Sequence, residues 1–256
     1  MSTEGGGASA PSRESLVNED AYLAHDGLGL YVVADGSSRG PAGEIAAQTA
    51  VSALEEYVGR AETPSAATLL RSGPSAGRAL DALRFAMGKV VAAAEASQEL
   101  DGMLTTVTMM LASQDRAVVC HIGDSRLYLV REGRTHQLTA DHDLTIGPQR
   151  PSAETYQQIP VQSFEVRLRE ADCFLLCTDG AEEAIGDPSV LGLADTHPRE
   201  IAAKIVASAR RLNPKQDATV VVVRVLEDEA PGWLLLSEPV WPWAYGHTLY
   251  SEHATA

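Results

Sequence analysis

The sequence has 256 residues, a formal net charge of -15 and a hydrophobic content of 45%. This length permits one large domain or two small ones. The acidic charge disfavours nucleic acid and anionic membranes as partners, because both carry negative surfaces. No apolar run is long enough to cross a bilayer, and three cysteines do not indicate a disulfide framework, so we expect a cytoplasmic location.

The first elements in chain order are a tail, a hairpin and two helices. Residues 1–16 have neither a basic segment nor an apolar stretch, which predicts a flexible N-terminal tail rather than a signal peptide. The stretch "DAYLAHDGLGLYVVADG" predicts a hairpin whose second strand is buried on both faces. Apolar residues then recur at helical spacing from Ala46 to Tyr57 and from Leu80 to Ala94.

A dense β region follows, in which "TTVTMMLAS", "AVVCHIG", "SRLYLVR" and "THQLT" predict an antiparallel meander. A strand pair, "QSFEVRLR" and "CFLLCTDG", precedes a helix near Pro198 with Ile201, Ile205 and Leu212 inward, and "ATVVVVRVL" is the last strand. Because strands and helices come in blocks, we expect an α+β fold. Residues 227–256 hold the three tryptophans and predict an irregular tail or, alternatively, a docking segment.

Acidic residues stand at the ends of several predicted strands. Asp35 and Asp179 each end an apolar strand before a glycine, Asp124 follows another strand, and Asp217 precedes the last one. A single Asp-Gly pair favours a turn. Carboxylates that converge would raise one another's pKa unless divalent cations neutralised them, and such oxygen ligands suit Mg²⁺ or Mn²⁺ better than zinc.

The sequence resembles the bacterial metal-dependent serine/threonine protein phosphatases of type 2C, from about Asn18 to Val225. In chain order, the resemblance is carried by "NEDAYL", "VVADGSSRGPAGEIAA", "MLTTVTMML", "HIGDSRLYLVREGRTHQLTADHDL", "LLCTDGAEEAIGD" and "QDATVVVV". It implies a phosphatase domain at 17–226, built as a four-layer α-β-β-α sandwich of two antiparallel sheets flanked by helices. It also implies that phosphorylated proteins are the substrates, with a serine/threonine kinase as the opposing enzyme.

The resemblance implies two Mn²⁺ or Mg²⁺ ions and a looser third one. Asp35 would bridge two ions, the Gly36 carbonyl would bind one of them, and Asp179 would complete the first metal site. Asp124 matches the position linked to the third ion. Two further acids would hold metal-bound waters, Glu19 and Asp20. A two-metal centre lowers the pKa of a shared water, which then attacks phosphorus.

The first and last motifs depart from the family pattern. After Gly36 the usual glycines and histidine are missing, and Arg39 either lends charge near the phosphate or is a solvated loop residue. In the last motif, Gln216 stands in the metal-binding position. Either Gln216 binds weakly, or the loop shifts so that Asp217 serves, which we favour because Asp217 is the only acid there. The departures support an alternative function, a degenerate phosphatase fold that acts as a regulatory or binding module.

Other expected positions carry less information. Arg13 is the only candidate for the phosphate-binding arginine of the family, and it either reaches the site or belongs to the tail. Between Asp143 and Phe164 most of the flap segment is missing, which should change substrate choice more than metal chemistry. His142 and His121 are expected to be structural, with His121 facing a strand neighbour. A nucleotide-binding enzyme is disfavoured, because no glycine-rich loop opens a helix after a strand.

Overall fold

The computed structural model describes residues 1–15, 17–37, 42–60, 76–147, 160–185 and 196–227. The chain divides into two compact units, Met1–Leu226 and Glu227–Ala256. Apart from Glu227, the expected tail at 227–256 lies outside the described residues. None of the helices in the described ranges has the length and apolar character needed to cross a membrane.

The described strands are β1 (Ser2–Ala10), β2 (Asp20–His25), β3 (Leu30–Asp35), β4 (Val107–Ser113), β5 (Arg116–Ile122), β6 (Arg126–Arg131), β7 (Arg134–Gln137), β8 (Gln162–Arg167), β9 (Cys173–Cys177) and β10 (Ala218–Leu226). The described helices are α1 (Gly43–Arg60), α3 (Ala76–Ala96), α4 (Glu182–Ile185) and α6 (Pro198–Leu212). Short 3-10 turns lie at η1 (Asp26–Leu28), η2 (Gln98–Leu100) and η4 (Asp179–Ala181).

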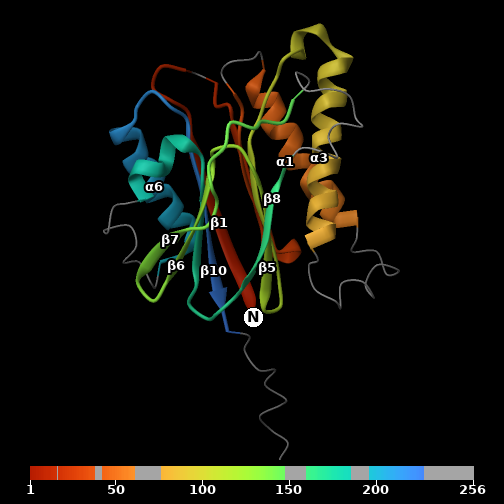
Figure 1. Cartoon of the computed structure of the whole chain (residues 1–256). Coiled ribbons are helices and arrows are strands. Elements are labelled where there is room, and N and C mark those ends of the chain that lie inside the picture. Colours follow the sequence, from red (N-terminus) through yellow and green to blue (C-terminus); the bar gives the residue numbers. More distant parts are fainter. Residues whose placement is uncertain (16, 38–41, 61–75, 148–159, 186–195, 228–256) are drawn as a thin grey trace, which may run out of the picture. The chain divides into compact units, whose positions relative to one another are not determined.

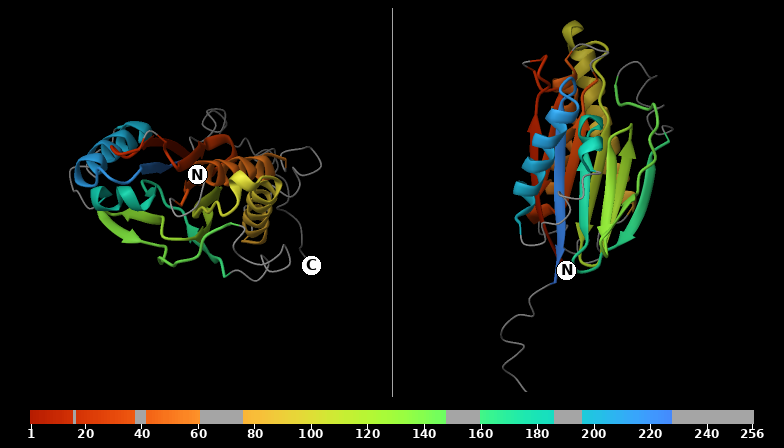
Figure 2. Two further views of the ribbon diagram at one scale, coloured as in Figure 1. Left: turned by 90° about the horizontal axis from the view of Figure 1, so that it is seen from above. Right: turned by 90° about the vertical axis from the view of Figure 1, so that its left-hand side faces the viewer.

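The strands form two antiparallel sheets between two layers of helices. One sheet has the order β1-β10-β9-β6-β7, and the other has the order β2-β3-β4-β5-β8. Helices α1 and α3 lie on one side of the pair of sheets and α6 lies on the other (Figure 1). The left view in Figure 2, seen from above, shows the same helices on the two sides of the sheets. The predicted α+β class and the α-β-β-α layering are confirmed.

Three apolar cores hold these layers together, since each sheet buries both faces. Val33 and Phe174 belong to the core between the sheets. Leu54 of α1 and Met87 of α3 pack against the second sheet. Ile205 of α6 packs against the first sheet, together with apolar residues of β9 and β10. The cores therefore fix the strand ends, from which the acidic residues project.

The expected flexible tail is wrong for residues Ser2–Ala10, which form strand β1 and pair with β10 along its length. Three consecutive glycines conceal this strand, because glycine is normally depleted in strands. A Cβ atom at Gly5 or Gly7 would lie 2.3 or 2.2 Å from a tyrosine ring, and one at Gly6 would lie 2.3 Å from the backbone nitrogen of Arg199. The glycines thus permit close packing on both faces of β1.

Strand positions were predicted better than strand partners. The β2–β3 hairpin, α1, α3 and the start of α6 are confirmed. The single meander is wrong, because β4 pairs with β5 in one sheet, whereas β6 pairs with β7 in the other. Strands β8 and β9 are not partners either, since β8 pairs with β5 and β9 pairs with β6 and β10. Leu212 is 50% exposed rather than inward.

Candidate metal centre

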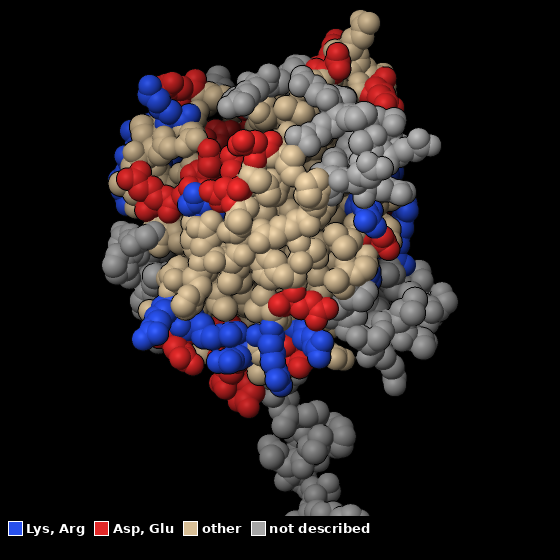
Figure 3. Space-filling view, in the orientation of Figure 1, with Lys and Arg blue, Asp and Glu red and all other residues tan. Residues whose placement is uncertain are grey.

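A cleft of about 940 Å³ opens at one end of the sandwich. Its lining is rich in carboxylates from several strand ends: Glu19, Asp20, Asp35, Asp124, Asp143, Asp179 and Asp217. Figure 3 shows acidic side chains gathered around a hollow near the upper end of the molecule. The expected convergence of acids at one end of the sandwich is therefore observed.

Strand register brings the acids together. Asp20 begins β2 and lies directly opposite Asp35, which ends β3. Asp179 follows β9 at the same end, because the hydroxyl of the preceding Thr178 donates to Asp20 at 2.8 Å. Asp124 follows β5 and is exposed at the cleft. Each carboxylate is therefore held by a regular element rather than by a long loop.

The glycines after Asp35 and Asp179 are required by close backbone contacts. A Cβ atom at Gly36 would lie 2.1 Å from the carbonyl oxygen of Gly43, and one at Gly180 would lie 2.0 Å from the carbonyl oxygen of Asp217. Any larger residue would push these segments apart. The Asp-Gly pairs thus bring the neighbouring backbone up to the cleft.

The central acids are poorly neutralised by the protein itself. Burial, together with the negative charges of Asp20 and Asp179, raises the pKa of Asp35 to about 9. Burial likewise raises the pKa of Asp20 to about 7, although hydrogen bonds with two threonines oppose this rise. Burial and then the charge of Asp124 raise the pKa of Asp179. These shifts follow from carboxylates that share a small volume without a counter-charge.

The donor set fits a hard divalent cation. The Thr178 hydroxyl donates to Asp20 Oδ2 at 2.8 Å, whereas Asp20 Oδ1 is buried without a hydrogen-bond partner in the described part of the chain. Oxygen donors of this kind suit Mg²⁺ or Mn²⁺. No three Asp, Glu, His or Cys side chains in the described ranges are arranged to hold an ion by themselves. Ligands must therefore also come from backbone carbonyls, amide side chains or water.

Asp217 is directed toward the backbone of the preceding segment. Its Oδ1 accepts a hydrogen bond from the backbone nitrogen of Ser12 at 2.6 Å, and its Oδ2 accepts one from Glu19 at 2.6 Å. Both carboxylate oxygens thus hold the chain that leads into Asp20. Asp217 also lines the cleft, and the metal-binding role that we favoured from the sequence stays a prediction.

Gln216 lies beside Asp179 instead. Its Nε2 donates to Asp179 Oδ2 at 2.6 Å, and its Oε1 accepts a hydrogen bond from Asn213 Nδ2. The loop between α6 and β10 is therefore not shifted in a way that would bring Asp217 to the place of Gln216. Of the two alternatives, the arrangement favours Gln216 as the residue that faces the central acids.

Neither of the two arginines that were expected near the phosphate, Arg13 and Arg39, is found among the described residues that line the cleft. The Arg13 backbone nitrogen donates to the Pro214 carbonyl oxygen at 2.8 Å, but Arg13 is not among the described residues that line the cleft. Lys215 does line the cleft. Sequence reasoning missed this residue, because no sequence motif distinguishes it from an ordinary surface lysine. Arg39 and most of the segment between Asp143 and Phe164 lie outside the described residues.

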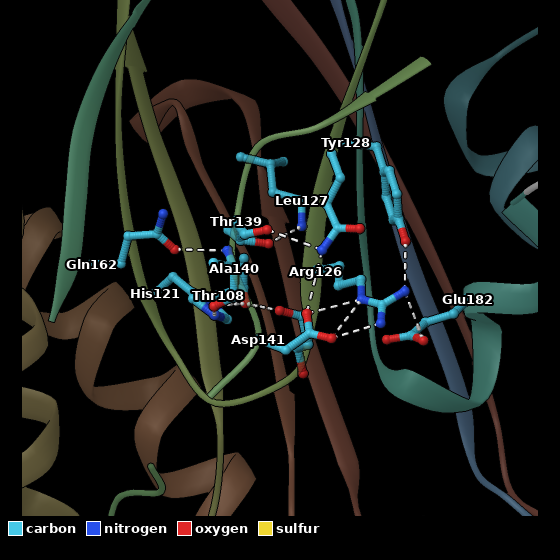
Figure 4. Close-up of polar contacts among 12 residues, drawn as sticks. Thr108, His121, Arg126, Leu127, Tyr128, Thr139, Ala140, Asp141, Gln162 and Glu182 are labelled. Atoms are coloured by element: carbon cyan, nitrogen blue, oxygen red, sulfur yellow. Dashed lines mark hydrogen bonds and ion pairs between the residues drawn. The ribbon is translucent and has the colours of Figure 1, made fainter. Parts of the chain in front are cut away.

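A second polar cluster supports the loops beside the cleft (Figure 4). Arg126 Nη2 lies 2.6 Å from Asp141 Oδ2, and its Nη1 lies 3.0 Å from Glu182 Oε2. Hydrogen bonds from Arg126 hold the pKa of Asp141 below its usual value. Burial raises the pKa of Glu182 to about 7, although the charge of Arg126 opposes this rise. Arg126 thus connects the loops that carry Asp124 and Asp179.

The two histidines are part of this support. His121 Nδ1 and the hydroxyl of Thr108, which lies opposite on β4, are 2.8 Å apart, so its predicted strand partner is confirmed. Burial lowers the pKa of His121 to about 4. His142 Nδ1 accepts a hydrogen bond from the Gly123 backbone nitrogen at 3.2 Å. His142 therefore holds the turn that precedes Asp124.

Known proteins match most of this chain. A serine/threonine protein phosphatase, PstP of Mycobacterium tuberculosis, is 31% identical over 230 residues, which cover 82% of this chain and 42% of PstP. The chain thus spans less than half the length of this relative. The serine/threonine phosphatase stp of Listeria monocytogenes is 25% identical over 229 residues, which cover 79% of this chain and 82% of stp.

Solved structures give the same result. The catalytic domain of PstP, in complex with two manganese ions, superimposes with a TM-score of 0.72 and 26% identity, over 88% of this chain and 99% of that domain. The family model described as "Protein phosphatase 2C" matches residues 7–227. This chain therefore belongs to the protein phosphatase 2C family.

Proposed function

We propose that this protein is a Mg²⁺- or Mn²⁺-dependent phosphatase that hydrolyses phosphoserine and phosphothreonine in proteins. The observation that carries the proposal is the pairing of Asp20 and Asp35 in a cleft where burial and like charges raise their pKa values. Divalent cations would neutralise these acids. Membership of the family and the two manganese ions of the PstP catalytic domain support the same conclusion.

The described residues supply ligands and orientation for two ions, with a third ion as a further part of the proposal. Asp35, the Gly36 carbonyl and Asp179 would hold the two ions, while Asp124 would serve the third. Glu19 and Asp20 would accept hydrogen bonds from metal-bound water, and the Thr178 hydroxyl fixes the Asp20 side chain. When bound, such ions lower the pKa of water so that it attacks phosphorus.

We further propose that Gln216, rather than Asp217, completes the metal site. The two Asp217 oxygens already accept hydrogen bonds from Ser12 and Glu19. Gln216 faces Asp179 through its amide nitrogen, which cannot bind a metal ion while it carries its hydrogens. A half-turn of the Gln216 amide would exchange its nitrogen and oxygen and direct the oxygen toward Asp179. The oxygen brings no charge, so we expect weaker binding than an aspartate would give.

The substrates would be proteins phosphorylated by a serine/threonine kinase. The names of the relatives support this substrate class, and the same names motivate a search for a kinase partner. All three cysteines are free thiols, which favours a reducing compartment such as the cytoplasm. A docking role for residues 227–256 is part of the same proposal, and deletion of this segment would test it by its effect on phosphoprotein turnover.

The function is tested by hydrolysis of a phosphothreonine peptide with Mn²⁺, with Mg²⁺ and with a chelator. We expect turnover that requires the cation and that is lost in Asp35→Asn. Asp81→Asn is a matched control, because Asp81 is an exposed acid of α3 outside the cleft. Turnover that survives chelation, or equal rates in wild type and Asp35→Asn, would refute the metal-dependent mechanism, whereas no turnover under any condition would leave the regulatory module as the function.

A further inference from the structure

Among the described residues that line the cleft, Lys215 is the only lysine or arginine. The carboxylates around it repel a phosphate monoester, which is a dianion at neutral pH. Bound cations would offset much of this repulsion near the central acids. At the mouth of the cleft, an approaching phosphate still requires a positive group, and Lys215 is placed to provide one.

The backbone on both sides of Lys215 is held in place relative to the central acids. Pro214 accepts a hydrogen bond from the Arg13 backbone nitrogen at 2.8 Å. On the other side, Gln216 donates to Asp179 at 2.6 Å, and Asp217 accepts from the backbone of Ser12 and Glu19. The Lys215 side chain therefore extends from a rigid turn whose next residue already touches the candidate metal site.

The ammonium group itself is only loosely engaged. Lys215 Nζ lies 3.8 Å from Glu14 Oε1, and the two side chains are 74% and 66% exposed. An exposed pair at this distance contributes little to stability. Lys215 can therefore exchange the Glu14 carboxylate for an incoming phosphate at small cost.

We propose that Lys215 binds the phosphate group of the substrate at the mouth of the cleft, in place of Arg13, and that Glu14 competes with the phosphate for it. This inference rests on the proposed phosphatase function. A lysine acts as a point charge with rotatable donors, whereas an arginine gives a planar, two-pronged contact with phosphate. Substrate recognition at this position therefore depends on charge more than on the orientation of the phosphate.

The test measures binding of inorganic phosphate to the Mg²⁺-loaded full chain by calorimetry, which does not require turnover. Lys215→Met keeps the aliphatic stem and should weaken phosphate binding about tenfold. Lys215→Arg should retain it. Glu14→Gln should strengthen it by about two- to fivefold, because the competing carboxylate is removed. Lys204→Met, an exposed lysine of α6, is the matched control and should change nothing.

The same variants should separate KM from kcat in peptide hydrolysis. Lys215→Met should raise KM for the phosphopeptide with kcat nearly unchanged, and Mg²⁺ affinity should stay at the wild-type value. Unchanged phosphate binding in Lys215→Met would overturn the proposal, and so would a loss that appears in Arg13→Met instead. If the wild type binds phosphate through Lys215 but hydrolyses no peptide, the proposed function fails while the phosphate site remains.

Discussion

Two groups of carboxylates lie at the same end of the sandwich, and they differ in what neutralises them. Asp141 and Glu182 share the guanidinium of Arg126, at 2.6 and 3.0 Å. Asp20 and Asp35 face each other across β2 and β3, and neither forms an ion pair with a lysine or arginine in the described part of the chain. The first group is complete in that its counter-charge comes from the protein, although burial still raises the pKa of Glu182 to about 7. The second group is incomplete, because it has no such counter-charge in the described part of the chain.

The difference shows how a structural acid can be told from a ligand. The pKa of Asp141 is lowered because Arg126 donates hydrogen bonds to it. Burial and neighbouring carboxylates raise the pKa of Asp35. A buried carboxylate without a counter-charge is costly, so it persists where an external cation supplies the missing charge. Experiments that remove acids from one group and then from the other should therefore have opposite consequences.

The largest expected effect is the loss of hydrolysis in Asp35→Asn. This change removes the acid at the centre of the incomplete group, and we expect turnover to fall about a thousandfold, which corresponds to several kcal/mol of transition-state stabilisation. In the absence of metal, the variant should be at least as stable as wild type, because one repelling charge is gone. Thermal unfolding with a chelator present checks this second outcome, and a large loss of metal-free stability would contradict it.

The second prediction concerns pH. The folded-state pKa values of Asp20 and Asp35 are raised to about 7 and about 9 from 3.8. Between 3.8 and its raised pKa, each of these acids holds its proton more firmly in the folded protein than in the unfolded chain. The free energy of unfolding should therefore fall as the pH rises through this interval. His121, whose pKa is lowered to about 4, acts in the opposite direction at acidic pH.

The range from about pH 7 to about pH 9 therefore isolates Asp35, because the pKa values of Asp20 and Glu182 are raised only to about 7. Urea unfolding at both ends of this range, with and without Mg²⁺, measures the effect. The chelated protein should lose stability toward alkaline pH, and Mg²⁺ should reduce this loss. A chelated protein that became more stable over the same range would show that Asp35 is already neutralised.

The third prediction concerns variants that remove one acid from the complete group, Asp141 and Glu182. Asp141→Asn leaves Arg126 without its bidentate partner, and we expect a loss of about 1–3 kcal/mol in the free energy of unfolding. Turnover per folded molecule should change much less than in Asp35→Asn. Glu182→Gln should have a smaller effect on stability, because its contact with Arg126 is a single ion pair at 3.0 Å. Chemical denaturation of the metal-free proteins measures both changes.

The smallest expected effect comes from adding a carboxylate next to the incomplete group. Gln216→Asp adds a charged oxygen beside Asp179, and we expect Mn²⁺ affinity to increase about tenfold, because ligand charge sets the affinity of such sites. Gln216→Asn is the uncharged control. Calorimetry reports the affinity directly. If Gln216→Asp left Mn²⁺ affinity unchanged, the residue beside Asp179 would not be a ligand.

The sequence predicted most of the strands, the main helices and the positions of Asp35, Asp124 and Asp179 at strand ends. These features depend on apolar periodicity and on residues at strand ends, both of which are local properties. Strand partners were harder, because the pattern of a buried strand is the same in either sheet. The turn at Gly123, with a φ of 116°, carries the chain from one sheet to the other, and no local signal distinguishes it from a hairpin turn.

The orientation of Asp217, the presence of strand β1 and the place of Lys215 depend on contacts over long distances in the chain, so the sequence pattern alone does not reveal them. Asp217 was favoured as a ligand because it is the acid of its motif, but its orientation is set by amides of Ser12 and Glu19. Strand β1 was missed because the tyrosine rings and the α6 backbone that exclude side chains from it come from other parts of the chain. Lys215 was missed for the same reason, because the contacts that hold its neighbours Pro214 and Gln216 come from Arg13 and Asp179.

The pairing of β1 with β10 has a consequence for how this protein folds. The Ser9 and Thr219 hydroxyls lie 2.6 Å apart although 210 positions separate them in the chain. During synthesis, β1 emerges long before β10, with which it pairs, so it must wait unpaired. Its glycine-rich composition gives it little tendency to aggregate meanwhile. The segment that leads into Asp20 is fixed by Asp217, immediately before β10, so a competent cleft should be among the last features to form on the ribosome.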